Sequence, residues 1–128
     1  MIVRNIDKIK EKPASHENKL DPGSYKKILF EKIDFAPGLR PQMINWARIP
    51  KKKSFRLHFH QDMVEVFILI KGKVLFQLNN ETKIISAGET VLVPEMSSHK
   101  MTNIGVSDVE YYVIGLSKGN KGKTVISE

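Results

Sequence analysis

The 128-residue sequence contains no cysteine, which excludes disulfide bonds, zinc–thiolate sites and thiol nucleophiles. It also lacks a long hydrophobic run. The longest apolar stretch, Val66 to Ile70, is far shorter than the roughly 20 residues that a membrane-spanning helix needs. The N-terminal segment has no apolar core long enough for a signal peptide. From these absences we expect a cytoplasmic protein with no membrane partner.

Acidic residues are few relative to basic ones: 14 Asp and Glu stand against 21 Lys and Arg, and the formal net charge is +7. Most of the basic residues lie in positions 1–56, where acidic residues alternate with them. This distribution is typical of a solvated surface rather than a nucleic-acid binding stripe, and no nucleic-acid binding motif accompanies it. We therefore expect no nucleic-acid partner.

Sustained helical periodicity is also lacking. From residue 25 to residue 116 the chain shows short β-rich runs, separated by turn signals about every ten residues, as in a sandwich or barrel. Gly72 and Asn79 occupy tight hairpin turns that require positive φ. The predicted strands cover residues 25–33, 41–49, 54–60, 64–70, 73–79, 82–86, 89–93, 99–104 and 109–116.

The sequence predicts one all-β domain at residues 25–116 with a polar segment at each end. Residues 1–24 are irregular and are expected to form an arm or an edge strand, and residues 117–128 are expected to form a mobile tail. The run 64–70 is apolar on both faces, which indicates a wall that also packs against another surface. A second subunit would provide that surface, so we predict a homodimer.

The most informative segment contains two histidines and a glutamate. Side chains alternate along a strand, so His58 and His60 point to the same side and can both reach one ion. Glu65 follows a bend, and an antiparallel return would bring its carboxylate back beside them. His99 offers a fourth ligand. This donor set suits one divalent ion of iron, manganese, nickel or zinc and leaves coordination positions open for a small molecule.

The spacing of these residues resembles the two sequence motifs of the cupin family. The first motif reads His58-x-His60, four residues, Glu65, six residues, Gly72. The second reads Gly88, five residues, Pro94, four residues, His99, three residues, Asn103. A lone His-x-His is common, but the full set at matching intervals is hard to reach by chance. The alternative is a metal-free barrel whose histidines satisfy one another, although burying such groups without an ion is costly.

The sequence departs from the family pattern at two glycines. Lys52 stands six positions before His58, and Met96 stands two positions after Pro94, where the family has glycine. Both positions fall in turns, so we expect altered loops and an intact site. His16, the remaining histidine, lies in the polar N-terminal segment and is expected to be a surface residue.

The resemblance implies a double-stranded β-helix, the jelly-roll barrel of cupins, with the metal inside. It also implies a metal-dependent enzyme acting on a small anionic or sugar-like molecule, with a dioxygenase-type oxidoreductase favoured over an isomerase. A non-catalytic module that binds a small ligand is the alternative, since the fold hosts both. Glu65 is the candidate catalytic residue, as a ligand and as a base on dissociation; Tyr111 and Tyr112 are further acid–base candidates.

Other side chains on the predicted strands either line a ligand cavity or form ordinary core and surface. Arg56 shares the parity of His58, so on a regular strand it points inward, where it could hold a carboxylate or phosphate. An arginine at the barrel mouth that reaches solvent is the rival interpretation. The pocket candidates are Arg56, Gln42, Arg48, Trp46, Phe67, Gln77, Met101 and Tyr112.

Overall fold

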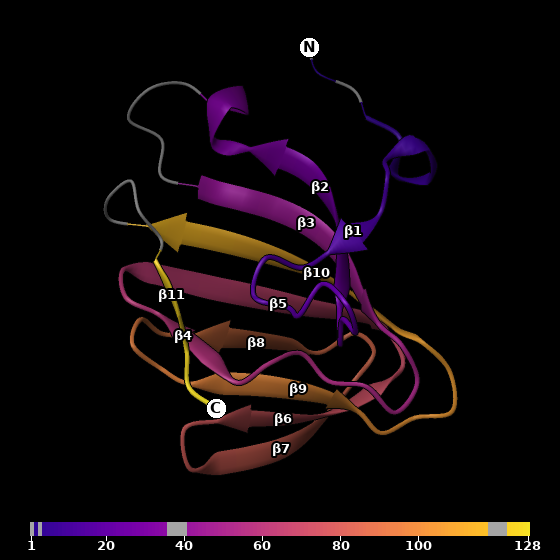
Figure 1. The fold of residues 1–128 in the computed structure, drawn as a ribbon, viewed down its shortest axis with the longest axis vertical. Coiled ribbons are helices and arrows are strands. Elements are labelled where there is room, and N and C mark those ends of the chain that lie inside the picture. Colours follow the sequence, from indigo (N-terminus) through magenta and orange to yellow (C-terminus); the bar gives the residue numbers. More distant parts are fainter. Residues whose placement is uncertain (1, 3, 36–40, 118–122) are drawn as a thin grey trace.

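The computed structural model describes residues 2, 4–35, 41–117 and 123–128, which form two antiparallel β-sheets packed as a sandwich (Figure 1). The six-stranded sheet has the order β1-β2-β3-β10-β5-β8, and the five-stranded sheet has the order β11-β4-β9-β6-β7. The fold is therefore the all-β jelly roll that the sequence predicts. The elements are η1 (Ile6–Lys8), β1 (Lys12–Pro13), β2 (Tyr25–Glu31), η2 (Lys32–Asp34), β3 (Pro41–Ile49), β4 (His58–His60), β5 (Met63–Lys71), β6 (Lys73–Leu78), β7 (Glu81–Ser86), β8 (Thr90–Val93), β9 (His99–Asn103), β10 (Val109–Ser117) and β11 (Thr124–Ile126).

The core lies between the two sheets and follows the two-residue period of the strands. On β5 and β10 each buried residue alternates with a more exposed one, so one face of each strand meets the core. Ile49, Val74 and Val109 are completely buried there. Phe67 packs edge-on against Phe76, their ring centroids 5.6 Å apart, which links β5 of one sheet to β6 of the other.

The chain changes sheets between β4 and β5. β4 pairs with β9 in the five-stranded sheet, whereas β5 pairs with β10 and β8 in the six-stranded sheet. From the sequence we expect the strand with Glu65 to run antiparallel beside the strand with His58 and His60. That path is wrong, because the two strands lie in different sheets. Residues 61–62 cross from one sheet to the other, so the carboxylate approaches the histidines across the core.

Strands form at both ends of the chain, outside the barrel that the sequence outlines. Lys12–Pro13 of β1 pairs with β2, which makes part of the N-terminal segment an edge strand. Thr124–Ile126 of β11 pairs with β4, with Thr124 opposite His60. Part of the segment predicted as a mobile tail thus forms β11, while residues 118–122 lie outside the described residues, and the mobility of the tail stays a prediction. Whether residues 25–116 form an independent domain stays a prediction.

Turn geometry follows the glycine pattern even where glycine is missing. Gly72, Gly88 and Asn79 have φ of 96°, 91° and 50°, as expected for tight turns. Lys52 and Met96, which replace the family's glycines, also adopt positive φ, at 65° and 60°. Both turns therefore have the left-handed backbone conformation at a residue that has a Cβ, and this conformation is strained for such a residue.

Among the described residues, no helix is long and apolar enough to cross a membrane.

Candidate metal centre

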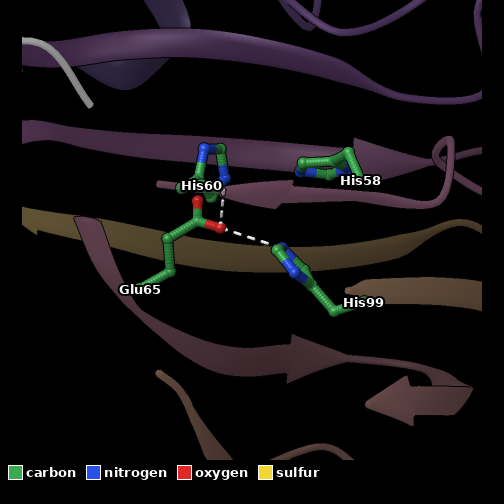
Figure 2. Close-up of side chains that lie close together, drawn as sticks. All are labelled: His58, His60, Glu65 and His99. Carbon is green, nitrogen blue, oxygen red and sulfur yellow. Dashed lines mark hydrogen bonds and ion pairs between the residues drawn. The ribbon is translucent and has the colours of Figure 1, made fainter. Parts of the chain in front are cut away.

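Four buried side chains from three strands meet in the interior of the sandwich (Figure 2). His58 and His60 come from β4, and His99 opens β9 beside them. Glu65 reaches the same place from β5 in the opposite sheet. Their exposed fractions are 2% for His58, 6% for His60, 5% for Glu65 and 0% for His99. The sequence prediction that these four residues lie together is met by this geometry.

Glu65 is the centre of the cluster. Its Oε1 lies 2.7 Å from Nε2 of His60 and 2.9 Å from Nε2 of His99. One ligand atom from each of the four residues can be chosen so that all lie within 4.8 Å of one another. This spacing is compatible with four ligand atoms around one ion.

Each imidazole is held through its Nδ1 by a group outside the cluster. Nδ1 of His58 contacts the carbonyl oxygen of Arg56, and Nδ1 of His99 lies 2.9 Å from the carbonyl oxygen of Ser97. A carbonyl can only accept a hydrogen bond, so in both rings Nδ1 carries the proton and Nε2 presents a lone pair. Nδ1 of His60 lies 3.0 Å from the Thr124 hydroxyl of β11.

The orientation of His60 fits a shared ion. Its Nε2 is buried and has no hydrogen bond of acceptable geometry, although Oε1 of Glu65 is only 2.7 Å away. The two atoms are close without being aligned as donor and acceptor. This is the arrangement of two ligands around one ion, which would also satisfy the buried nitrogen. Three imidazoles and one carboxylate suit iron, manganese, nickel or zinc, so these residues can bind a metal ion.

The protonation states of Glu65 and His58 are those that a metal requires. Burial alone would raise the pKa of Glu65, but the close approach of Nε2 of His60 and His99 to its carboxylate, and the positive charge of these rings when they are protonated, outweigh it, so the pKa of Glu65 falls below its usual range. Burial, together with the charges of His16 and His99, lowers the pKa of His58 to about 3. An ionised carboxylate and a neutral imidazole are the forms that bind divalent ions.

The cluster forms part of the wall of a cavity of about 210 Å³. This volume is below the 300–1,000 Å³ of drug-sized ligand sites and suits a small metabolite. His58, His60 and Glu65 line the cavity, so a small molecule inside it can reach the cluster. Of the sequence-derived pocket candidates, Gln42 and Phe67 also line it.

Three of the other candidates lie on the outer face of the six-stranded sheet. Trp46 and Tyr112 are cross-strand partners on β3 and β10, and the ammonium of Lys27 lies 5.1 Å from the Trp46 ring centroid. Arg48 is held by Glu11 at 2.8 Å and Asp108 at 3.2 Å. The expectation that these side chains line the ligand cavity therefore fails, because their strand parity points them away from the core.

Three further candidates miss the cavity for different reasons. Met101 is 1% exposed and belongs to the apolar core, and Gln77 alternates with buried Phe76 on β6 and so faces outward. Arg56 precedes β4, which begins at His58, so strand parity does not extend to it. Its Nε lies 3.6 Å from Oε2 of Glu128, and it lines a separate polar depression. For Arg56, the interpretation as a solvent-reaching arginine is the one that fits.

Several cavity residues lie outside the sequence-derived list. His16 from the N-terminal arm stacks on His58, with ring centroids 4.1 Å apart, so it is a residue of the site and not a free surface residue. Lys26, Asn45, Tyr111 and Thr124 also line the cavity. The alternation along β3 and β10 would have identified Asn45 and Tyr111 as inward-facing residues. No local pattern places His16 or Thr124, since each lies in a polar segment far from the motifs.

The comparisons with known proteins show the family. The cupin domain model matches residues 45–115, a span that includes all four residues of the cluster, so the chain belongs to the cupin family. An uncharacterised protein of Methanocaldococcus jannaschii is 31% identical over 64 residues, which are 50% of this chain and 51% of that protein. The oxalate-binding protein of Thermotoga maritima is 27% identical over 67 residues, which are 52% and 55% of the two chains.

The chain thus spans about half the length of these curated relatives. Among solved structures, a Thermotoga maritima protein named as a predicted oxalate decarboxylase superposes with a TM-score of 0.78 at 21% identity, covering 91% of this chain and 99% of that one. At this identity the likeness shows the fold alone.

Proposed function

We propose that this cupin is a metal-dependent enzyme that acts on a small anionic or sugar-like molecule at His58, His60, Glu65 and His99. The observation that carries the proposal is that His58, His60 and Glu65 of this buried cluster line a cavity of metabolite size. A structural metal site is usually closed, whereas a catalytic site keeps positions open to a ligand. We favour an oxidoreductase of the dioxygenase type over an isomerase.

The chain's own residues divide the work of the site. His58, His60 and His99 would hold the ion as neutral donors, and Glu65 would supply the single negative charge. When bound, the ion would polarise an oxygen of the substrate as a Lewis acid. Phe55 and Phe67 pack against the histidine rings and exclude water from that side of the cluster. Glu65 is the candidate base on dissociation from the ion, because its carboxylate borders the cavity, although its lowered pKa makes it a weak base.

A non-catalytic binding module is the second candidate, and one observation favours it. Tyr111 is the buried hydroxyl that lines the cavity, and burial raises its pKa above the usual range. It therefore remains protonated and can donate a hydrogen bond, but it is a poor base. The relative named as an oxalate-binding protein supports a binding role of this kind.

Two measurements separate these candidates. The chain is loaded with iron(II), manganese(II), nickel(II) or zinc(II), and oxygen uptake and product formation are followed with small carboxylates, including oxalate, and sugar phosphates. Turnover that depends on the metal and is lost in Glu65→Gln supports the enzyme. Ligand-dependent stabilisation of the fold without turnover supports the binding module. The absence of both would contradict the proposal.

We also propose that the protein is a homodimer. The outer face of the six-stranded sheet carries large apolar side chains, of which Leu92 is 62%, Ile70 43% and Leu116 42% exposed. Exposed apolar side chains on one sheet face favour an association surface there. Sedimentation equilibrium of the full chain should give twice the monomer mass, and Leu92→Lys should shift it toward the monomer. A strict monomer at all concentrations would contradict the proposal.

A further inference from the structure

The cavity has a second polar region that the metal cluster does not use. Asn45 on β3 is 6% exposed and lines the cavity, and its Oδ1 has no hydrogen-bond partner in the structure. A buried amide oxygen without a partner costs about 1–3 kcal/mol. Such an amide is expected to gain a partner when the cavity is filled, either a donor to Oδ1 or, with the amide group turned, an acceptor for its N–H groups, so Asn45 points to a ligand.

Lys26 on β2 lies beside this amide. Its register partner is Ala47, while the next inward position of β2, Ile28, is the partner of Asn45 itself. Lys26 lines the cavity, is half-buried, and donates from Nζ to the hydroxyl of Ser15. An ammonium has three N–H donors, so two remain for other acceptors.

Lys26 forms no ion pair within 4 Å among the described residues, although Glu31 acts on it from a greater distance. Within the part of the chain that the structure describes, Arg4, Arg48 and Lys53 each lie within 4 Å of an acidic side chain, and Lys26 has no such ion pair. Its partner in the β1–β2 pair is another lysine, Lys12. Burial and the charge of Lys12 lower the pKa of Lys26, and the charge of Glu31 only partly opposes them. An anion in the cavity would balance this half-buried cation.

The cavity wall between the two polar regions carries several apolar side chains beside the Tyr111 hydroxyl. β3 and β10 lie between β2, which carries Lys26, and β5, which carries Glu65. Ala47, Val113 and Phe67 line the cavity along these strands. A ligand that satisfies both regions therefore has two polar ends joined by a short apolar part. At about 30 Å³ per water molecule, the cavity holds about seven waters, the size of a four- or five-carbon acid.

We propose that Lys26 and Asn45 form an anion subsite that binds the far carboxylate of a small dicarboxylic acid whose other end faces the metal cluster. This inference rests on the proposed function and names its substrate class. Lys26 supplies charge and hydrogen bonds to the far carboxylate. The Asn45 side chain completes the site, with its amide group turned to donate to the carboxylate or with Oδ1 accepting from a ligand hydroxyl.

The test compares ligands that differ only in the second charge. Isothermal titration of the zinc-loaded full chain uses malonate, succinate and glutarate, each beside its monomethyl ester. We expect at least one diacid to bind about tenfold more tightly than its ester. Lys26→Met should remove that difference and leave ester binding within about twofold, and Lys26→Arg should restore part of it. Lys27→Met is the matched control, because Lys27 lies on the outer face of the same strand over Trp46.

The outcomes distinguish the subsite from the metal centre. Diacid preference in the wild type and Lys27→Met, lost in Lys26→Met at equal zinc content, supports the subsite. A zinc-loaded protein that binds each diacid and its ester equally, or that keeps its preference in Lys26→Met, overturns the subsite and leaves the metal centre standing. A chain that takes up no zinc overturns both. Unchanged thermal unfolding of the variants shows that the fold is intact.

Discussion

The ring of His16 stacks on the ring of His58, with centroids 4.1 Å apart and planes inclined by 23°. Phe55 packs edge-on against both rings, at 5.5 Å from His16 and 5.3 Å from His58. Residues 14–18, the part of the N-terminal segment called the arm, therefore reach the candidate metal centre and hold one of its candidate ligands. The arm is held there by Glu17, whose side chain is only 2% exposed.

Loss of the stacked ring should weaken metal binding without abolishing it. A ring pair of this kind contributes about 0.5–1.5 kcal/mol, which corresponds to a roughly two- to tenfold change in affinity. His16→Ala should weaken zinc affinity by that factor, measured by competition with a chromophoric chelator. His16→Phe keeps a flat ring in place and should retain most of the wild-type affinity. Equal affinities for the wild type and His16→Ala would contradict a positioning role for His16.

The arm should detach from the sandwich in acid. The Glu17 carboxylate accepts hydrogen bonds from the backbone N–H of Gly23 at 2.7 Å and of Arg56 at 3.2 Å. Burial alone would raise the pKa of Glu17, but these bonds and His16 lower it below its ordinary value of 4.5. A lowered pKa in the folded state means that the stabilisation is complete above pH 4.5 and is lost as the pH falls below it.

Urea unfolding with a chelator present measures this contribution. At pH 7 we expect Glu17→Gln to lower the free energy of unfolding by about 1–3 kcal/mol, and we expect the difference from the wild type to shrink at pH 3.5. Glu81→Gln is the control, because the Glu81 side chain is 66% exposed. This variant should change the free energy of unfolding little at either pH. A Glu17→Gln deficit that is independent of pH would rule out titration of this carboxylate as the cause.

Two turns should become more stable when glycine is introduced. Lys52 and Met96 adopt φ of 65° and 60°, a region that costs a residue with a Cβ about 1–2 kcal/mol. Part of that gain is offset because glycine is more flexible in the unfolded chain. We expect Lys52→Gly and Met96→Gly each to raise the free energy of unfolding by about 0.5–1 kcal/mol.

The neighbouring Lys51 provides the control for these turns, because it is exposed and is not among the positive-φ residues. Lys51→Gly should be neutral or destabilising, measured in the same denaturant titration. If Lys51→Gly stabilised the protein as much as Lys52→Gly, the backbone explanation would be wrong.

Thr124 should influence metal affinity through His60. Its hydroxyl lies 3.0 Å from Nδ1 of His60 and orients that ring from β11. Groups that hold a ligand in this way typically affect metal affinity 10- to 100-fold. Thr124→Val should weaken zinc binding within that range, and Thr124→Ser, which keeps the hydroxyl, should restore it. Matching zinc affinities for the valine and serine variants would show that the hydroxyl has no such role.

The sequence predicts the parts of the fold that depend on local pattern. Residue spacing in the two motifs identifies His58, His60, Glu65 and His99 without any knowledge of the path between them. Alternation locates most of the predicted strands to within one or two residues, but the strand predicted from residue 54 begins only at His58. The need for positive φ at Gly72 follows from its place in a hairpin.

The missed parts depend on long-range packing. The bend after His60 could lead either to a hairpin within one sheet or to a crossing into the other sheet, and both look the same in the sequence. The sequence therefore does not reveal that Glu65 approaches His60 from the opposite sheet. Parity assigns Arg56 to the interior only if the strand extends to it, and β4 begins two residues later. His16 reaches the site from a polar segment with no periodicity of its own.

The central claim is that His58, His60, Glu65 and His99 bind one metal ion, and elemental analysis of the purified, untagged protein tests it most directly. Inductively coupled plasma mass spectrometry should find about one iron, manganese, nickel or zinc per chain. The double variant His58→Ala/His99→Ala should contain none, and His16→Ala should retain the ion because His16 is not a ligand. A wild-type chain that contains no metal and takes up none when each is supplied would contradict the account.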